Sequence, residues 1–453
     1  MQNSKDEMVE TYDVIGLGFG PAGIALAVAL EDVEEQRGGQ SGLKALFIEQ
    51  APDSAWQPGM LLAGTDIQHH FLRDFATPRN PRSKFTFPNY LKEKGRLFAF
   101  GLLGGNPGRL EWADYIHWVA NQVSRKALYL HSVLSIEAQP CENSDQISLA
   151  RVTAKDLVEG STKHFYARNL VVCTGRKPNV PPLYSSLVGP RVFHSHHYIP
   201  SIQHVSAENN PRFAVIGSGQ NAIEVLLDLA DRFPSSTLYS VNRNSGFRLY
   251  DLGHFSNQVY FPEEADYFFS LDKQGRRRLF EDVRLTNYSS VDQDVSRSLY
   301  WRVYEESIAG MNRIHVIKRS NVTEVAEQDG SFKLTLDDTY RHTKQELQAD
   351  VIVLCTGYIE EQIPSFLEPM RQYLELDDDS DPIVSRDYQI ITQDRFRVGL
   401  FLNGLTEQTH GISDATSFSM MALKAQRILD RLESNRQDQP AAAGGFKLKK
   451  GVS

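Results

Sequence analysis

The sequence contains few cysteines. Only Cys141, Cys173 and Cys355 occur in 453 residues, and they form neither a CxxC pair nor a spacing typical of a metal site. Cys173 and Cys355 each end an apolar, strand-like run, so we expect buried small side chains rather than reactive thiols. The cysteines therefore exclude a disulfide reductase, which needs a redox-active pair, and no metal site is predicted.

Excess positive charge and long apolar runs are also missing. The formal net charge is −9, which argues against nucleic acid as a partner, because binding to phosphates favours a basic face. No apolar run approaches the ~18 residues that a membrane-spanning helix needs. The first residues, MQNSKDEMVETYD, lack the apolar centre of a signal peptide. We expect a soluble cytoplasmic protein without nucleic-acid or membrane partners.

A strand, a glycine-rich turn and a helix follow one another in residues 12–30, YDVIGLGFGPAGIALAVAL. This order is typical of a dinucleotide-binding turn, in which free N–H groups at the helix N-terminus bind a pyrophosphate. Gly16 is expected to allow the tight turn and Gly18 to let the backbone approach the phosphates. A second strand ends in an acid suited to a ribose hydroxyl. The residues predicted to bind this nucleotide are Gly16, Gly18, Gly20, Pro21 and Glu49.

The same signals recur in residues 212–230, RFAVIGSGQNAIEVLLDLA. Gly217, Gly219 and Gln220 are predicted to bind a second nucleotide. The next strand ends in Arg243 instead of an acid, which favours the 2′-phosphate of NADPH over NADH.

Two nucleotide turns predict FAD followed by NADPH, and the absence of a redox cysteine pair favours transfer of electrons from the flavin to oxygen. The fold class is therefore α/β, with two Rossmann-like dinucleotide-binding domains and a small helical substrate segment. The expected division is 10–207 plus 347–433 for FAD, 208–254 plus 312–346 for NADPH, 255–311 for the substrate segment, and 434–453 as a disordered tail.

Nearly the whole chain resembles the N-hydroxylating flavin monooxygenases, the ornithine, lysine and diamine N-hydroxylases of siderophore pathways. The resemblance rests on a set of segments that includes GLGFGPAG, with Pro21 in place of the third glycine, and GSGQNAIE. Baeyer–Villiger and ordinary flavin-containing monooxygenases carry a glycine where this chain has Ser195. The other matching segments are AWQPGM, FLRDFATPRNPRSKFTFPNYLKEKGRL, EWADYIHWVA, FSNQVYFPEE, TNYSSVD, DVIVLCTGY and HGISD.

The resemblance implies a reaction. NADPH reduces FAD, the reduced flavin takes up O₂ as a C4a-hydroperoxide, and a neutral primary amine attacks its distal oxygen. The expected substrate is the side-chain amine of L-ornithine or, second, of L-lysine. Family members assemble into dimers or tetramers, so a homo-oligomer is expected.

The resemblance also implies roles for individual residues. Gln68 is expected near the reactive edge of the flavin, and Asn287 is expected to take part in catalysis. Arg73 replaces the lysine that grips the substrate carboxylate in the ornithine enzymes, and arginine can do so as a bidentate fork. Phe418 stands where those enzymes have a serine that touches substrate. The substrate-binding set is Arg73, Asn257, Asn287 and Phe418, and the flavin contacts are Trp56, Gln68 and Thr416.

Arg73 belongs to a basic loop, residues 69–87, HHFLRDFATPRNPRSKFTF. Its four cationic side chains predict a site for a small anionic molecule together with the nucleotide phosphates. Other amines remain open as substrates, either a diamine or the α-amine of an amino acid, although a diamine offers Arg73 no carboxylate. A sulfur- or carbon-oxygenating flavoenzyme and a non-catalytic flavoprotein are the further alternatives.

Overall fold

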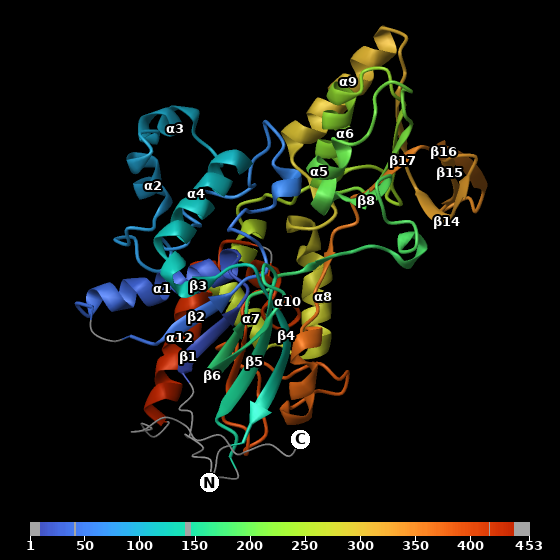
Figure 1. Cartoon of the computed structure of the whole chain (residues 1–453). Coiled ribbons are helices and arrows are strands. Elements are labelled where there is room, and N and C mark those ends of the chain that lie inside the picture. The colour runs from blue at the N-terminus through green and yellow to red at the C-terminus, as the bar shows by residue number, and fades with distance from the viewer. Residues whose placement is uncertain (1–9, 40–41, 141–145, 416, 439–453) are drawn as a thin grey trace.

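The structure is a computed structural model that describes residues 10–39, 42–140, 146–415 and 417–438. It contains two α/β units, each built around parallel strands (Figure 1). The first unit contains β1, β2, β5 and β6, and the second carries α6, α9 and β17. The predicted fold class, with two Rossmann-like domains, is confirmed.

The first sheet has the strand order β3-β2-β1-β6-β5-β4, and β19 pairs with β6. β1 runs parallel to β2 and β6, and β6 also runs parallel to β19. β4, β5 and β6 form an antiparallel meander. The strands are β1 (Thr11–Leu17), β2 (Ala45–Ile48), β3 (Ala127–Leu128), β4 (His131–Gln139), β5 (Leu149–Asp156), β6 (Thr162–Val172) and β19 (Gly399–Leu402).

Helix α1 (Pro21–Gln36) is buried between this sheet and two other helices. All its residues from Gly23 to Leu30 are buried, because the run GIALAVAL is apolar on every side. α1 packs against α4 (Arg109–Gln122) and α12 (Met421–Asp438). The predicted tail 434–453 therefore begins too early, since apolar residues hold α12 against α1 and the helix continues to Asp438. Residues 439–453 lie outside the described part.

The second sheet is entirely parallel, in the order β13-β10-β9-β17-β8. A three-stranded antiparallel sheet, β14-β15-β16, follows β13 along the chain. The elements of this unit are α5 (Tyr198–Ile202), α6 (Gln220–Arg232), α9 (Gln293–Ile308), β8 (Val192–His194), β9 (Phe213–Ile216), β10 (Leu238–Val241), β13 (Ile314–Ile317), β14 (Ser320–Gln328), β15 (Ser331–Asp338), β16 (Lys344–Ala349) and β17 (Val351–Leu354).

The structure moves both predicted domain boundaries. β8 and β17 were assigned to the FAD domain, but β17 pairs with β8 and with β9. Both strands therefore belong to the second sheet. The chain crosses between the units after Cys173 and again after Cys355. Directly beyond these cysteines, β7 (Lys177–Pro178) and β18 (Tyr358–Ile359) pair antiparallel, so the two crossing segments lie side by side.

The substrate segment is helical, as predicted, and reaches back to the first unit. Its α7 contacts α10, which follows β19 along the chain. The segment contains the 3-10 helix η5 (Ser256–Tyr260), α7 (Pro262–Ser270), α8 (Lys273–Val283), η6 (Arg284–Thr286) and β12 (Ser290–Val291), which pairs with β11 (Arg248–Leu249). The predicted range also includes α9, which contacts α6 and belongs to the second unit.

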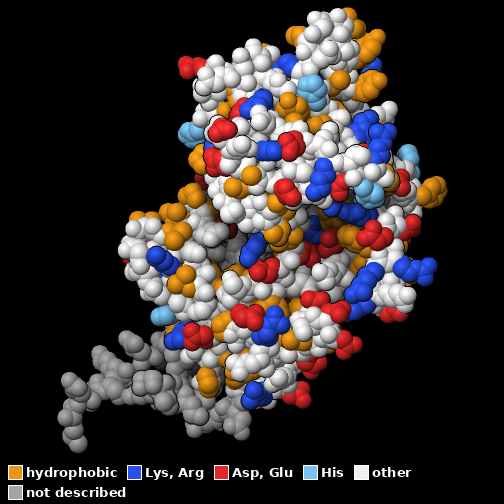
Figure 2. Space-filling view, turned by 90° about the vertical axis from the view of Figure 1, so that its right-hand side faces the viewer, with side chains coloured by type: hydrophobic (Ala, Val, Ile, Leu, Met, Phe, Trp, Pro, Cys, Tyr) orange, Lys and Arg blue, Asp and Glu red, His pale blue; other side chains and the backbone are white. Residues whose placement is uncertain are grey.

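The remaining elements surround the first unit. They are α2 (Phe87–Glu93), α3 (Leu97–Leu103), α10 (Glu407–His410) and α11 (Ile412–Ala415), with the short 3-10 helices η1 (Pro58–Met60), η2 (Ser124–Lys126), η3 (Pro182–Tyr184), η4 (Ser195–His197) and η7 (Ser365–Tyr373). Within the described ranges, no helix combines the length and the apolar character that crossing a membrane requires. Figure 2 shows Lys and Arg side chains at a hollow between the upper and lower parts of one face.

Candidate active site

The first glycine turn joins β1 to α1. Gly18 has a φ of 104°, and a Cβ there would lie 2.8 Å from the carbonyl oxygen of Cys173. Gly20 is the N-cap of α1, and a Cβ there would meet open space. A Cβ at Gly23 would lie 2.5 Å from the carbonyl oxygen of Gly18. Gly18 therefore allows the tight turn, Gly20 leaves space for a ligand to approach, and Gly23 allows close packing of the helix. Together they form the GxGxxG pattern.

The prediction for this turn was displaced by two residues. Gly16 lies within β1, where a Cβ would come 2.2 Å from the ring of Phe47, so its role is to make room for that ring. Pro21 is the first residue of α1, as predicted, but it does not replace a third glycine. Sequence analysis missed Gly23, although counting the motif from Gly18 would have found it.

The end of α1 suits an anion. Within the described part of the chain, no side chain caps the N-terminus of this helix, so its first N–H groups can bind a pyrophosphate. The Glu49 carboxylate, directly after β2, accepts hydrogen bonds from the backbone N of Phe19 at 2.6 Å and of Ala51 at 2.8 Å. The acid is thereby held beside the turn, where a ribose hydroxyl would bind. These features fit the adenosine diphosphate part of FAD.

The second glycine turn repeats this geometry. Gly217 has a φ of 147° and would place a Cβ 2.3 Å from the carbonyl oxygen of Cys355, and Gly219 is the uncapped N-cap of α6. Asn242 follows β10 as Glu49 follows β2. It is 3% exposed, and neither atom of its side-chain amide has a hydrogen-bond partner among the residues that the structure describes. A neutral amide beside the exposed Arg243 suits a ribose that bears a 2′-phosphate.

Gln220 begins α6, and its contact with the second nucleotide stays a prediction. Its side-chain oxygen accepts from the backbone N of Asp292 at 2.9 Å, and its Nε2 donates to Glu224 at 3.0 Å. Because these bonds occupy the side chain, only the backbone of Gln220, at the first turn of α6, is placed for the nucleotide. Gln68 lies on the other side of Asp292 and donates to its carboxylate at 2.7 Å.

Arg73 contacts the substrate segment. Its guanidinium lies over the ring of Tyr260, 5.2 Å from the centroid, and burial lowers its pKa. None of the carboxylates that the structure describes forms an ion pair with it. Tyr260 also donates to the carbonyl oxygen of Thr286 at 2.9 Å. Arg73 is thus a half-buried cation available to an anionic ligand.

Tyr260 connects three of the predicted substrate residues. It shares the short helix η5 with Asn257, and Thr286, its acceptor, directly precedes Asn287. Both asparagines are half-buried. The structure therefore brings Arg73, Asn257 and Asn287 to one region, and Tyr260 is the member that sequence analysis missed. Its spacing of three residues from Asn257 was the available signal.

Two of the other three cations of the basic loop pair with acids of α1. Arg79 forms a buried ion pair with Asp32 of α1, and the exposed Lys84 pairs with Glu35 of the same helix at 3.1 Å. The loop prediction was therefore wrong for these two residues, because acids of α1, distant in sequence, neutralise them. Arg82 is exposed.

A buried charge cluster lies beside Asn287. Arg176 pairs with Glu360 at 3.1 Å and with Glu407 at 2.6 Å, and it donates to the Tyr288 hydroxyl at 2.6 Å. The Tyr288 hydroxyl in turn donates to Glu407. Burial raises the pKa of Glu360 to about 7, although Arg176 acts in the opposite direction. Burial likewise raises the pKa of Glu407.

Phe418 lies in an aromatic core. Its ring packs on Phe75, Trp112 and His69 at centroid distances between 5.1 and 5.6 Å, and the half-buried Trp56 lies 6.4 Å away. Desolvation lowers the pKa of His69 to about 4, so this histidine is neutral at pH 7. The role of Phe418 as a substrate contact stays a prediction, as does the flavin contact of Trp56. Thr416 lies outside the described residues.

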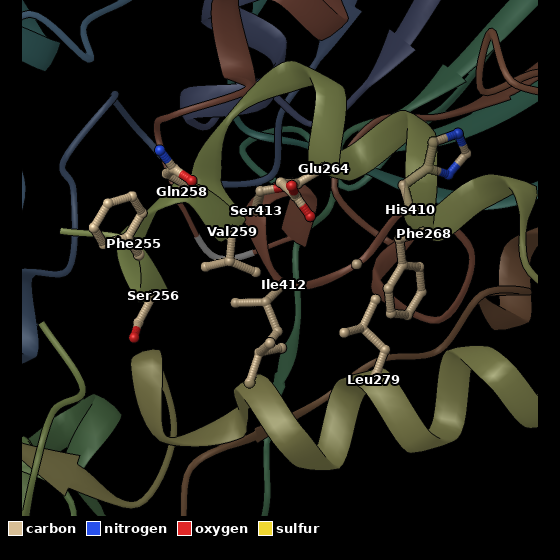
Figure 3. Close-up of a pocket in the computed structure, with 12 residues that line it drawn as sticks. Phe255, Ser256, Gln258, Val259, Glu264, Phe268, Leu279, His410, Ile412 and Ser413 are labelled. Carbon is tan, nitrogen blue, oxygen red and sulfur yellow. The ribbon is translucent and has the colours of Figure 1, made fainter. Parts of the chain in front are cut away.

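A cavity of about 150 Å³ adjoins η5 on the side of α7 and α8. Figure 3 shows Val259, Ile412 and Leu279 facing its centre. Ser256 and Gln258, the neighbours of Asn257, also line it. Burial lowers the pKa of His410, at its edge, to about 4. The described residues contain no group of His, Cys, Asp and Glu arranged to hold a metal ion.

Comparison with known proteins decides the family. Residues 10–360 match the family model described as L-lysine 6-monooxygenase/L-ornithine 5-monooxygenase. The chain belongs to this family. It is 33% identical to the L-ornithine N(5)-monooxygenase of Pseudomonas aeruginosa, with 95% of this chain and 96% of the relative covered.

Two solved structures support the assignment. The L-lysine 6-monooxygenase of Pseudomonas syringae is 40% identical, with a TM-score of 0.84 over 94% of this chain and 99% of that one. The ornithine N-hydroxylase of Kutzneria sp. 744, in complex with reduced FAD, NADP⁺ and L-ornithine, is 31% identical, with a TM-score of 0.88 over 95% and 100%.

As a member of this lysine and ornithine monooxygenase family, the chain is an FAD- and NADPH-dependent N-hydroxylating enzyme. The predictions of family, enzyme class and cofactors are confirmed. The two glycine turns, Glu49 and the Asn242–Arg243 pair are the residues of this chain that fit the two nucleotides.

Proposed function

We propose that this enzyme N-hydroxylates the side-chain amine of L-ornithine or L-lysine with NADPH and O₂. The single observation that carries the choice of an amino acid is Arg73, a half-buried guanidinium without a described acidic partner. A carboxylate is the natural partner for such a fork. One relative is named for L-ornithine and another, the enzyme of P. syringae, for L-lysine. These names support an amino acid with a side-chain amine as the substrate and do not favour either of the two.

The protein's part in the reaction is to bind, orient and exclude water. Bound FAD, once reduced by NADPH, supplies the activated oxygen atom. Arg73 binds the α-carboxylate, and Tyr260 beneath it holds the guanidinium in place. Asn257 and Asn287 offer both donors and acceptors without a charge, so they can hold an amine without stabilising its protonated form.

Charge disfavours a diamine as the substrate. A diamine would bring a second ammonium group towards Arg73 and offer it no carboxylate. The α-amine of an amino acid remains an outcome of the test below. We also expect a cytoplasmic homodimer or homotetramer and a product used in siderophore synthesis.

The test measures aerobic NADPH oxidation by the FAD-loaded protein with a panel of amines, and quantifies hydroxylamine and hydrogen peroxide. L-ornithine is compared with putrescine, which lacks only the carboxylate, and with 5-aminovalerate, which lacks only the α-amine; L-lysine and cadaverine form the second series. We expect hydroxylamine in near-equal yield to NADPH for L-ornithine or L-lysine, and mainly peroxide for both diamines.

Equal coupling with ornithine and putrescine would remove the carboxylate role of Arg73. Hydrogen peroxide alone with every amine would remove the proposed substrates. Coupling with 5-aminovalerate would show that the side-chain amine is the group hydroxylated, whereas coupling with amino acids that lack a side-chain amine would indicate the α-amine.

A further inference from the structure

A ring of hydrogen bonds links Gln68 to the second unit and back. Gln68 Nε2 donates to Asp292 Oδ2 at 2.7 Å, and the Asp292 backbone N donates to Gln220 Oε1 at 2.9 Å. Gln220 Nε2 donates to Glu224 Oε1 at 3.0 Å, and Glu224 forms an ion pair with Arg109 at 2.7 Å. Gln68 and Arg109 belong to the first unit, and the other three residues belong to the second.

Arg109 and Asp66 close the ring. Arg109 Nε donates to the carbonyl oxygen of Asp66 at 3.0 Å, and the Asp66 carboxylate accepts from the backbone N of Gln68 at 2.9 Å. Gln68 has a φ of 61°, a backbone conformation that residues other than glycine seldom adopt. One aspartate thus holds its backbone in this conformation, and a second holds its side chain. Such held strain is typical of functional positions.

The ring is largely buried. Arg109, Gln220 and Glu224 are each less than 7% exposed. Burial raises the pKa of the Glu224 carboxyl, while Arg109 and Gln220 act to lower it. A buried ion pair adds little net stability compared with apolar side chains of the same size. Its contribution here is to fix the position of α6 and of Asp292 relative to Gln68.

The chemistry of the Gln68–Asp292 contact determines which way the amide of Gln68 faces. An ionised carboxylate only accepts hydrogen bonds, so it binds the NH₂ group of the amide. The carbonyl oxygen Oε1 then points away from Asp292. The Tyr250 hydroxyl also interacts with the Gln68 side chain from the second unit.

We propose that Asp292 is a positioning residue that acts through Gln68 and turns Oε1 of its amide towards the flavin as an acceptor. The hydrogen-bonded chain of Gln220, Glu224 and Arg109 holds Asp292 in place. A second consequence is that Gln68 is connected through one residue, Asp292, to Gln220, which begins α6 at the second glycine turn. The inference rests on the proposed function and on the expectation, implied by the family resemblance, that Gln68 lies near the reactive edge of the flavin.

The test is a double-mutant cycle with Asp292→Asn and Gln68→Ala. Asparagine is of similar size but both donates and accepts, so it no longer fixes the amide of Gln68. Two readouts are taken at equal FAD content: the visible absorption spectrum of bound FAD, and the rate of its reduction by NADPH without oxygen. Asp292→Asn is expected to alter the spectrum and slow reduction about tenfold, since a hydrogen bond to a charged group is lost.

In the Gln68→Ala background, Asp292→Asn should slow reduction by less than about twofold further, because its effect passes through Gln68. The same tenfold loss in both backgrounds would overturn the proposal. The control is Glu306→Gln, at the opposite end of α9. Glu306 is also buried and forms an ion pair, with Arg313 at 2.7 Å. A wild-type spectrum and rate are expected for this control, and an equal loss there would indicate general damage to α9.

If Asp292→Asn does not retain FAD, Gln220→Met provides a second variant, since it removes the acceptor of the Asp292 backbone N–H but leaves the carboxylate. The same spectral change, weaker in size, is expected, and an unchanged spectrum would count against the ring. Flavin reduction without oxygen needs no amine, so these measurements remain valid if the proposed substrates prove wrong. Hydroxylamine yields then test the proposed function separately.

Discussion

Arg73 is the residue on which the substrate proposal depends. Tyr260 holds its guanidinium from below, and burial lowers its pKa because the charge is partly desolvated. A cation in this state gains much from a carboxylate ligand, since water no longer screens the pair fully. Arg79, six residues later, is equally cationic but is already neutralised by Asp32. Residue type alone therefore does not identify the substrate contact.

Arg73→Ala should raise KM for L-ornithine or L-lysine about 10- to 100-fold, because a charge-assisted hydrogen bond is worth roughly 1.5–3 kcal/mol. The rate of flavin reduction by NADPH should change less than about twofold, since we propose that Arg73 binds the amine substrate and not the nucleotide. Steady-state and stopped-flow kinetics measure the two quantities. The matched control is Arg82→Ala, an exposed arginine on the same loop, which should leave both unchanged. An unaltered KM in Arg73→Ala would mean that this residue does not bind substrate.

The first glycine turn is the element that we expect to bind FAD, and the surroundings of its glycines predict separate tasks for them. Gly23 packs the helix against the turn, whereas Gly20 leaves space in front of the helix N-terminus. A Cβ at Gly23 must displace backbone, but a Cβ at Gly20 meets no protein atom. Packing and ligand binding can therefore be separated by two alanine substitutions.

We expect Gly23→Ala to destabilise the FAD-free protein by about 1–3 kcal/mol, the cost of overpacking a close contact, and to weaken FAD binding. Gly20→Ala should leave the stability of the FAD-free protein within about 1 kcal/mol of wild type and still weaken FAD binding at least tenfold. Thermal unfolding and FAD titration measure the two effects. The control is Gly101→Ala in α3, where a Cβ meets nothing and alanine favours the helix. Equal stability losses at Gly20 and Gly23 would contradict this division.

Local signals explain what the sequence could predict. A strand, a glycine turn and a helix are adjacent in the chain, so both nucleotide turns and the acid or arginine after the next strand were found from short segments. The register of the motif within the first turn was predicted wrongly, because Gly16 fits the same spacing. Only the contact with the ring of Phe47 explains why a glycine stands at that position. A partner distant in sequence accounts for the error in the basic loop, since Asp32 neutralises Arg79. Another such partner, Asp292, occupies the side-chain oxygen of Gln220.

At the scale of the whole molecule, the units are joined by two crossing segments that pair as β7 and β18. The sequence did not reveal these boundaries, because β8 and β17 find each other across more than 150 residues. Beside the pair, Arg176 of the first crossing binds Glu360 of the second, together with Glu407 of the first unit. One guanidinium thus pairs with two buried carboxylates at the place where the units are connected. The cluster therefore carries an excess of negative charge when both carboxyl groups are ionised.

Burial of this cluster makes the junction sensitive to pH. Burial raises the pKa of Glu360 from its ordinary value of 4.5 to about 7, so the folded protein holds this proton more tightly than the unfolded chain does. Its contribution to stability is therefore complete below about pH 4.5 and is lost as the pH rises through about 7. The difference corresponds to about 3 kcal/mol.

Glu360→Gln, which keeps a neutral group of the same size, should gain up to that amount of stability over wild type between pH 4.5 and 8. Denaturant unfolding at several pH values measures the gain. Glu361→Gln, the neighbouring and more exposed acid, is the control and should follow the wild-type pH dependence. A constant difference between Glu360→Gln and wild type across this range would show that Glu360 stays ionised in the folded protein.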